Sequence, residues 1–223
     1  MKREFLITGD GSVTIHLPEW NEQYHSKHGA IAEALHVFIA TGLNQVIDLN
    51  PSGDISILEM GFGTGLNAYL TLLQSTQHKI DIHYTGVEAF PVAPSEVGQL
   101  NYAELVNNSE ELFLKLHEIP WNENVRLTDH FHLHKQKKLF SEVKDKDQYD
   151  LVYFDAFGPR VQPELWTEEI FRPVFNACKS GGILVTYSAK GSVRRTLESV
   201  GFLVERLPGP PGKREMLRAT KTS

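Results

Sequence analysis

The chain has 223 residues, of which 41% are hydrophobic and 22% are charged, and its formal net charge is −6. This length and composition are ordinary for one globular domain, and the negative charge excludes binding of nucleic acid by overall electrostatic attraction. No apolar run reaches the roughly 18 residues of a membrane helix, no signal-peptide pattern is present, and the single cysteine, Cys178, excludes an internal disulfide, so we expect a cytoplasmic protein without membrane association.

The first fifty residues predict a β-hairpin and a helix. Residues 4–17 contain two β-rich runs on either side of Gly9-Asp10-Gly11, and such a turn is typical of a hairpin. From about Ala30 apolar residues recur at helical spacing, and Gly42 is expected to end this helix. We therefore assign residues 1–50 to an N-terminal extension built from the hairpin and the helix.

The core, residues 51–223, alternates apolar runs with helical segments. We expect seven strands, at residues 55–61, 81–89, 124–134, 149–156, 181–188, 201–208 and 214–220. This alternation is typical of an α/β, Rossmann-like fold whose mostly parallel sheet is covered on both faces. The loop PGPPGK between the last two strands is too short for a crossover helix, so the last strand is expected to be antiparallel.

A glycine-rich loop follows the first strand of this core. The sequence ILEMGFGTGLNAYL contains a strand, then Gly61, Gly63 and Gly65, then a helix, and such a loop lets a nucleotide-like cofactor approach the backbone. The spacing is GxGxG, which differs from the GxGxxG of dinucleotide-binding enzymes and from the Walker phosphate loop. Glu59, two residues earlier, would repel a pyrophosphate but suits the sulfonium and ammonium groups of S-adenosyl-L-methionine.

A second acid, Glu88, ends the next strand in YTGVEAF. A carboxylate at this place accepts hydrogen bonds from two ribose hydroxyls, in NAD as well as in S-adenosyl-L-methionine. Glu88 therefore supports a nucleoside cofactor without choosing between these two. The structural alternative for Glu59 and Glu88 is a pair of exposed acids at strand ends.

Five stretches together resemble one family. They are YHSKHGAIAEALHVFIATGL (24–43), LEMGFGTGLN (58–67), DAFGPRVQPELWT (155–167), GGILVTYSAKGSVRRTLESVGF (181–202) and GPPGKREM (209–216). Here the chain is similar to the S-adenosyl-L-methionine-dependent methyltransferase component of the tRNA wobble-uridine enzyme MnmC and to its free-standing relatives, called MnmD or MnmC-like proteins. The glycine loop is common to many methyltransferases, whereas the other patterns in combination are much more specific.

The resemblance implies a class I methyltransferase fold and methyl transfer to the exocyclic amine of 5-aminomethyl(-2-thio)uridine at tRNA position 34. It implies that Asn67 and Tyr24 join the glycine loop and the two acids in binding the cofactor. The oxidase module of the bifunctional enzyme has no counterpart in this sequence. The aminomethyl intermediate would then come either from a separate FAD-dependent oxidase or directly from the modification pathway, with tRNA as the main partner.

The fourth strand ends in Asp155, within YDLVYFDAFGPRVQPELW. An alkylamine is largely protonated at neutral pH and must be uncharged to attack a methyl group, so a carboxylate here can attract the ammonium and align the amine. Asp155 either takes the proton or only orients the amine, because pairing with a carboxylate also raises the pKa of an amine. Its structural alternative is an acid that braces the loop. Trp166 either stacks on the uridine base or packs beneath the loop.

Aromatic and basic residues follow the fifth strand. Tyr187, at the end of that strand, is expected to line the acceptor pocket, and Ser192 is expected to cap the next helix. The candidates for contacts with tRNA phosphates are Arg194, Arg195, Lys213 and Arg214. The alternatives are a solvated basic surface and an ion pair between Glu215 and one of these arginines.

The stretch DHFHLHKQKK departs from the family pattern. For contact with adenine it offers Lys135, Gln136 or Asp129. Its alternating histidines are His130, His132 and His134. A strand at a sheet edge carries polar residues as a rule, so we expect no metal site there.

Three other functions remain compatible with these residues. The first is methyl or aminopropyl-type transfer to another amine, which activity without tRNA would favour. The second is a non-catalytic RNA-binding module, which weak binding of S-adenosyl-L-methionine would favour. The third, an NAD-dependent dehydrogenase, is the least favoured because the glycine spacing does not match.

Overall fold

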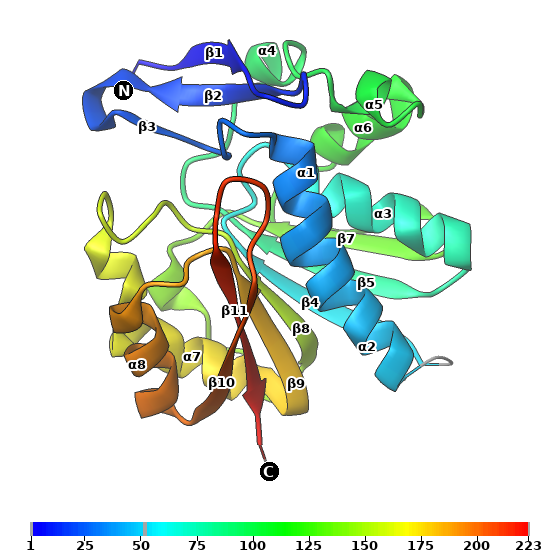
Figure 1. The fold of residues 1–223 in the computed structure, drawn as a ribbon. Coiled ribbons are helices and arrows are strands. Elements are labelled where there is room, and N and C mark those ends of the chain that lie inside the picture. The colour runs from blue at the N-terminus through cyan, green and yellow to red at the C-terminus, as the bar shows by residue number, and fades with distance from the viewer. Residues whose placement is uncertain (1, 51–52, 223) are drawn as a thin grey trace.

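The computed structural model describes residues 2–50 and 53–222. An eight-stranded sheet with helices on both faces forms the centre, and a three-stranded sheet lies at one end of it (Figure 1). The central strand order is β10-β11-β9-β8-β4-β5-β7-β6, and the small sheet has the order β1-β2-β3. The predicted boundary between residues 50 and 51 adjoins Pro51 and Ser52, which lie outside the described residues.

The elements occur in the following order along the chain. The strands are β1 (Glu4–Ile7), β2 (Val13–Leu17), β3 (Glu22–Gln23), β4 (Ile55–Met60), β5 (Ile82–Val87), β6 (Asn124–Thr128), β7 (Phe131–Gln136), β8 (Tyr149–Phe154), β9 (Cys178–Thr186), β10 (Phe202–Pro208) and β11 (Glu215–Lys221). The α-helices are α1 (Ala30–Ala34), α2 (Asn44–Leu49), α3 (Leu66–His78), α4 (Pro94–Val97), α5 (Tyr102–Leu105), α6 (Glu110–Glu118), α7 (Glu168–Ala177) and α8 (Gly191–Val200). The other helical segments are η1 (Pro18–Trp20), the π-helix η2 (Leu35–Leu43), η3 (Phe140–Glu142) and η4 (Pro163–Trp166).

The predicted fold class is confirmed. Strands β4, β5, β7, β8 and β9 form the parallel part of the sheet. The last strand, β11, is antiparallel to both β9 and β10, as predicted. The sheet has one strand more than expected, because residues 124–134 do not form a single strand.

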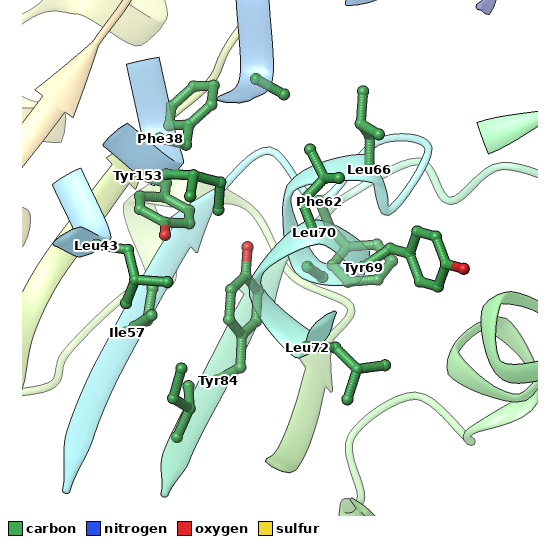
Figure 2. Close-up of a cluster of buried hydrophobic side chains, with 14 of the residues drawn as sticks. Phe38, Leu43, Ile57, Phe62, Leu66, Tyr69, Leu70, Leu72, Tyr84 and Tyr153 are labelled. Atoms are coloured by element: carbon green, nitrogen blue, oxygen red, sulfur yellow. The ribbon is translucent and has the colours of Figure 1, made fainter. Parts of the chain in front are cut away.

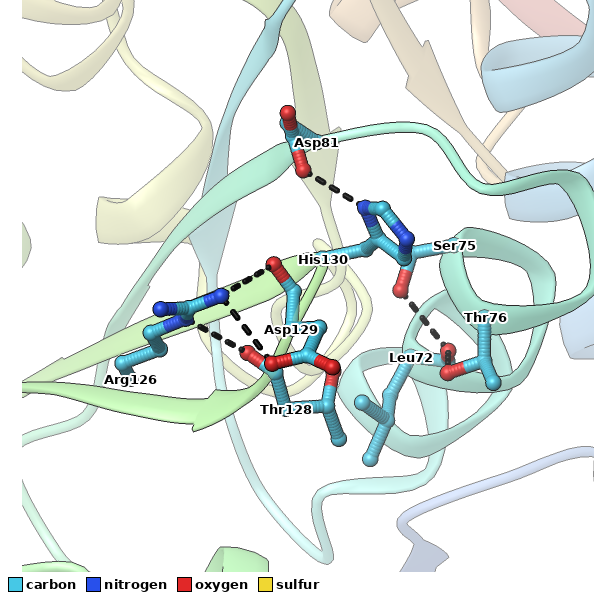
Figure 3. A network of polar contacts seen from close by, with 8 residues as sticks. All are labelled: Leu72, Ser75, Thr76, Asp81, Arg126, Thr128, Asp129 and His130. Carbon is cyan, nitrogen blue, oxygen red and sulfur yellow. Dashed lines mark hydrogen bonds and ion pairs between the residues drawn. The ribbon is translucent and has the colours of Figure 1, made fainter.

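A turn divides this segment into β6 and β7. Arg126 donates from Nη2 to the Asp129 carboxylate at 3.0 Å and from Nε to the Thr128 carbonyl at 3.3 Å (Figure 3). His130 pairs with Asp81, just before β5, at 2.8 Å. The chain reverses here, and β6 returns antiparallel to β7 as the edge of the sheet. Because His130 lies in the turn, the three histidines do not share one strand.

The helix predicted from Ala30 does not end at Gly42. It continues through η2 and α2 to Leu49. A Cβ on Gly42 would lie 3.0 Å from Val185 Cγ2 and 3.3 Å from Tyr153 Cε1. The glycine therefore marks a place where the helix packs tightly against the sheet.

This long helix also bears on the expectation that no segment of the chain is long and apolar enough to form a membrane helix. Residues Ala30–Leu49 have a mean hydropathy of 1.4 and are long and apolar enough to cross a membrane by those two criteria alone. Half of this segment is buried inside the protein, as in the core helix of a globular domain. No other helix of residues 2–50 and 53–222 meets both criteria.

Aromatic side chains fill the space between the sheet and the helices beside the glycine loop (Figure 2). Tyr84 on β5 and Tyr153 on β8 are both buried, with ring centroids 6.1 Å apart. Phe38 of η2 packs on Tyr153 at 5.1 Å. This packing fixes η2 against the sheet, so the segments that follow β4 and β8 start from rigid positions.

The three-stranded sheet, called here the N-terminal sheet, lies across the carboxyl ends of the parallel strands (Figure 1). The predicted hairpin is confirmed as β1 and β2, and β3 extends it. In its turn, Asp10 accepts hydrogen bonds from the backbone N–H groups of Ser12 at 3.1 Å and Ala32 at 2.9 Å. Arg3 pairs with Glu96 of α4 at 2.7 Å. These contacts join the N-terminal sheet to α1 and to α4.

Replacing Gly42 by valine is expected to lower the free energy of unfolding by about 1–3 kcal/mol, because the added carbons meet Val185, Tyr153 and Leu151 in a packed core. Urea denaturation of the wild type and of the variant measures this difference. Gly98→Val is the matched control, since a Cβ on Gly98 meets nothing within 4 Å. An equal loss of stability in both variants would contradict the packing explanation.

Candidate active site

The glycine loop turns sharply at the carboxyl end of β4. Gly61 has a φ of +101°, and a Cβ there would lie 2.5 Å from the carbonyl oxygen of Asp155, so a larger residue does not fit. Gly63 has a φ of +50° and packs against the ring of Tyr24. Gly65 directly precedes α3. The three predicted glycines thus form a backbone cradle beside Asp155 and Tyr24.

Glu88 and Tyr24 both contact the middle of this loop. Glu88 Oε2 accepts a hydrogen bond from the Gly63 N–H at 3.1 Å, and its Oε1 accepts one from the Phe90 N–H at 2.9 Å. The Glu88 side chain is only partly buried and keeps lone pairs for hydroxyl donors. Burial raises the pKa of Tyr24 to about 12, so its hydroxyl stays protonated.

Asn67 joins the two predicted acids Glu59 and Asp155. Its Nδ2 donates to Glu59 Oε1 at 3.0 Å and to Asp155 Oδ2 at 2.8 Å. Glu59 is fully buried, which contradicts the alternative of an exposed strand-end acid. Burial, with the charge of Asp155 as a second cause, raises the pKa of Glu59 well above its usual range. Burial, followed by the charge of Glu33, raises the pKa of Asp155 to about 7.

Asn67, Glu59 and Asp155 form a cluster, called the Asn67 cluster, in which two hydrogen-bond acceptors are unused. Glu59 Oε2 and Asn67 Oδ1 are buried, and neither has a hydrogen-bond partner within residues 2–50 and 53–222. A buried acceptor without a donor is costly. These atoms therefore suit a donor from a ligand, or a proton on Glu59 itself.

A third acid, Glu33 of α1, also acts on Asp155 and was not predicted from the sequence. Glu33 is buried, and its Oε2 pairs with Lys213 Nζ. The same ammonium lies 3.8 Å from the centroid of the Tyr187 ring. Tyr187 donates its hydroxyl to the Ala156 carbonyl at 2.8 Å, next to Asp155. Tyr187 thus borders the site, and the ammonium of Lys213, a candidate for phosphate contact, lies between Glu33 and the Tyr187 ring.

Trp166 packs beneath the loop that follows Asp155. Its side chain is 5% exposed, and its Nε1–H donates to the Phe157 carbonyl at 2.8 Å. Its ring contacts Phe154 and Tyr187 edge-on. The prediction that Trp166 stacks on a substrate base is not supported, because the ring is already covered. The residues Pro163–Trp166 form the 3-10 helix η4, which carries Trp166 at its end.

Other aromatic residues border the outer side of this loop. Phe157 is partly exposed and contacts Trp20 at 5.6 Å and Tyr24 at 5.0 Å, both edge-on. Arg160 donates to the Glu22 carboxylate at 3.0 Å. These contacts fasten the loop to the N-terminal sheet. Sequence reasoning missed Trp20 because more than a hundred residues separate it from Phe157 along the chain.

His25 links the N-terminal sheet to the glycine loop. Its Nδ1 pairs with Thr14 Oγ1 at 3.0 Å, and its Nε2 pairs with Thr64 Oγ1 at 3.3 Å. Burial lowers the pKa of His25 to about 4, so the ring is neutral at pH 7. This neutral connection adds no positive charge to an acidic site.

The residues expected to contact adenine do not all lie near the glycine loop. Asp129 lies in the turn before β7, at the opposite end of that strand from the glycine loop. Lys135 is buried and donates to the His117 carbonyl at 2.6 Å, and burial lowers the pKa of Lys135 to about 8. Gln136 Oε1 is buried and has no hydrogen-bond partner among the described residues. Of the three candidates, Gln136 alone thus offers an unused acceptor near this end of the sheet.

The arginines predicted to contact phosphates differ in their exposure and ion pairing. Arg195 is exposed on α8, whereas Arg194 pairs with Glu198 one turn later at 2.8 Å. Arg214 is exposed, and Glu215 pairs with Arg206 at 3.1 Å, so the suspected pairing of Glu215 with a candidate arginine does not occur. Ser192 lies inside α8, which is a correction to its predicted capping role.

No metal centre accompanies these groups in the described part of the chain. Residues 2–50 and 53–222 contain no group of three or more His, Cys, Asp or Glu side chains that can hold a metal ion. The ring of His132 stacks on that of His83 at 4.9 Å. Cys178 is buried, and burial raises its pKa to about 12, so its thiol is a poor nucleophile.

Residues 98–222 match the model of a family described as S-adenosyl-L-methionine-dependent methyltransferase. This region is more than half of the chain and contains Asp155, Tyr187 and Lys213. The chain belongs to this methyltransferase family. Its cofactor is therefore S-adenosyl-L-methionine, in agreement with the GxGxG spacing and with Glu59.

The methyltransferase resembles curated proteins named tRNA 5-methylaminomethyl-2-thiouridine biosynthesis bifunctional protein MnmC. It is 31% identical to the protein of Hydrogenovibrio crunogenus over 88% of this chain and 31% of that protein. It is 28% identical to the protein of Polaromonas naphthalenivorans over 96% of this chain and 35% of that protein. The chain spans about a third of the length of these relatives. The resemblance to MnmC inferred from the motifs is confirmed.

Solved structures also match this chain. MnmC2 from Aquifex aeolicus matches 100% of this methyltransferase and 71% of its own chain, with a TM-score of 0.81 and 26% identity. Spermidine synthase from Thermotoga maritima matches 98% of this chain and 68% of its own, with a TM-score of 0.58 and 13% identity. The second likeness shows the shared fold alone.

The residues at the carboxyl ends of the strands fit the cofactor. Gly61, Gly63 and Gly65 bring the backbone of the loop against Asp155, Tyr24 and His117, respectively, where a Cβ would be crowded. Glu88 would hold hydroxyl groups. The acids Glu59 and Asp155, with the unused acceptors of the Asn67 cluster, suit a molecule that carries a sulfonium and an ammonium group and no phosphate.

Asp155→Asn is expected to stabilise the cofactor-free protein at pH 8 but not at pH 4. A carboxyl group whose pKa is raised by folding binds a proton more tightly in the folded chain, so the wild type loses stability as pH rises from about 4 to about 7. The variant, which has no such carboxyl, should gain about 1–3 kcal/mol relative to the wild type over this range. Urea denaturation at both pH values measures it, and a difference that is independent of pH would contradict the raised pKa.

Proposed function

We propose that this methyltransferase transfers a methyl group to the 5-aminomethyl group of 5-aminomethyl(-2-thio)uridine at tRNA wobble position 34. The observation that supports this acceptor most directly is the place of Asp155 beside the glycine loop, where burial raises its pKa to about 7. A carboxylate at that place suits an acceptor that arrives protonated. The names of the MnmC relatives support 5-methylaminomethyl-2-thiouridine as the product.

The chemistry requires few groups from the protein. S-adenosyl-L-methionine, held by Glu88, the glycine loop and the cluster of Asn67, Glu59 and Asp155, would supply an electrophilic methyl group for the amine nitrogen, with the sulfonium sulfur as the leaving atom. Asp155 accepts one proton from the substrate ammonium, which frees the nitrogen lone pair, and then releases that proton to water. Asn67 holds Asp155 in position through its 2.8 Å hydrogen bond. The remaining contribution is alignment of the two reactants.

The basic surface supports a tRNA acceptor. Arg195 and Arg214 are exposed, and both belong to the C-terminal part of the chain that also carries Tyr187. Such side chains bind phosphates without reading sequence. We place this reaction in the cytoplasm, and a separate FAD-dependent oxidase or an earlier step of the modification pathway would supply the aminomethyl group.

A small amine is the second candidate acceptor. The acids around Asp155 attract any alkylammonium, and the site does not by itself require RNA. Activity on free amines in the absence of tRNA would favour this candidate.

Methyl transfer from labelled S-adenosyl-L-methionine should occur on tRNA that carries 5-aminomethyl-2-thiouridine and not on an unmodified transcript of the same tRNA. Nuclease digestion and chromatography locate the label. Asp155→Asn should lower turnover at saturating tRNA by about 10²–10⁴-fold, as expected for loss of a general base. Label on free amines but on neither tRNA would replace the proposed acceptor, and unchanged turnover in Asp155→Asn would remove this residue from catalysis.

Arg195→Ala and Arg214→Ala should each weaken tRNA binding and reduce the slope of log Kd against log salt concentration by about 1, because each loses one phosphate contact. Arg194→Ala should have a smaller effect, since Glu198 already neutralises this guanidinium. Filter binding between about 50 and 200 mM salt measures the slopes. Lys146→Ala, on an exposed loop outside the proposed surface, is the control. Equal slopes in all four variants would place the phosphate surface elsewhere.

A further inference from the structure

Lys213 has an unusual place for a lysine on a surface loop. It lies in the loop between β10 and β11, which passes beside the start of α1 (Figure 1). Its side chain is 31% exposed, but its ammonium is bound between the Glu33 carboxylate, whose side chain is 9% exposed, and the face of the Tyr187 ring at 3.8 Å. A lysine that served only solubility would keep its charge in water.

This ammonium lies at the acceptor side of the site. Tyr187, whose ring it covers, donates its hydroxyl to the Ala156 carbonyl, one residue after Asp155. The charges of Glu33 and Lys213 both act on the Asp155 carboxyl, with opposite signs. The glycine loop reaches the same residue from the other side, because Gly61 packs against the Asp155 carbonyl. Lys213 thus places a primary alkylammonium close to the residue that must receive the acceptor amine.

We infer that the Glu33 carboxylate and the Tyr187 ring form a subsite for the alkylammonium group of the acceptor, and that Lys213 occupies this ammonium subsite when no acceptor is bound. The inference rests on the proposed function, because it takes the acceptor to be a primary amine. A lysine side chain and a 5-aminomethyl group both end in a CH₂–NH₃⁺ unit with three donors. Either one satisfies the carboxylate and the aromatic face in the same way.

The exchange explains how the site would accept an amine without leaving a buried charge unpaired. An arriving ammonium takes over the contacts of Lys213, whose ammonium then moves into water. The Glu33 carboxylate, which also accepts a hydrogen bond from the Ser26 N–H at 3.2 Å, therefore always faces a cation. A wobble uridine without the amine leaves Lys213 in place. The subsite therefore binds the acceptor amine before any proton moves to Asp155.

The test measures binding and not turnover. The probes are tRNA carrying 5-aminomethyl-2-thiouridine and the same tRNA carrying 2-thiouridine, each with S-adenosylhomocysteine present. The wild type should bind the two tRNAs with Kd values within about threefold of each other, because the arriving ammonium only replaces that of Lys213. Lys213→Met, whose subsite is vacant, should bind the aminomethyl tRNA about 10–100-fold more tightly than the 2-thiouridine tRNA, as expected for hydrogen bonds to a charged group. Adding Glu33→Gln to Lys213→Met should reduce this ratio to about 1–3. Adding Glu205→Gln instead, which alters another ion-paired carboxylate, on β10, should keep the ratio of Lys213→Met.

Lys213→Met also separates two roles of this lysine. With the subsite vacated, the Kd of the aminomethyl tRNA should fall while that of the 2-thiouridine tRNA stays the same. If Lys213 instead contacts phosphate, both Kd values rise equally and the inference is wrong. It is also wrong if the folded variant with both Lys213→Met and Glu33→Gln keeps the ratio of Lys213→Met. Methyl transfer by the wild type, combined with equal binding of both tRNAs by Lys213→Met, would overturn the subsite alone, whereas absence of both preference and methyl transfer would overturn the proposed function as well.

Discussion

The hydrogen bonds from one amide nitrogen, Asn67 Nδ2, to two carboxylates are the contacts on which the site depends. They hold Glu59 at the end of β4 and Asp155 at the end of β8 together where burial opposes two negative charges. A donor shared by both acids lets them lie close together without a permanent cation between them. The site therefore keeps its preference for positively charged molecules, which is the property that a sulfonium cofactor and an amine acceptor have in common.

The site also depends on being covered by the N-terminal sheet and the segment that follows it. The central sheet alone supplies the glycine loop and the strand-end acids, but Tyr24, His25 and Glu33 come from the segment that crosses above them. The contacts that hold this segment are dispersed: a neutral imidazole at Thr64, an aromatic edge at Phe157 and ion pairs at its margins. Each such contact is weak by itself, and together they hold the segment over the strand-end acids.

The parts of the molecule that were predictable depend on local pattern. The GxGxG loop, the acids at the ends of β4, β5 and β8, and the antiparallel last strand follow from residue type, spacing and loop length, and the structure places them as expected. Glu33 and Lys213 could not be paired in this way, because 180 positions separate them and neither lies in a pattern that signals a contact. Gly42 was misinterpreted for a related reason. A glycine that ends a helix and one that lets a helix touch a sheet look the same in sequence, and only the neighbouring Val185 and Tyr153 distinguish them.

The contact between α1 and the β10–β11 loop also has a meaning for folding. A contact made by a partly exposed side chain such as Lys213 opens at lower free energy than the buried core. The glycine loop and the buried acids can be complete while this closing contact is still absent. Cofactor binding and acceptor recognition thus depend on parts of the structure that open at different free energies. Mild denaturant should abolish acceptor recognition while cofactor binding persists.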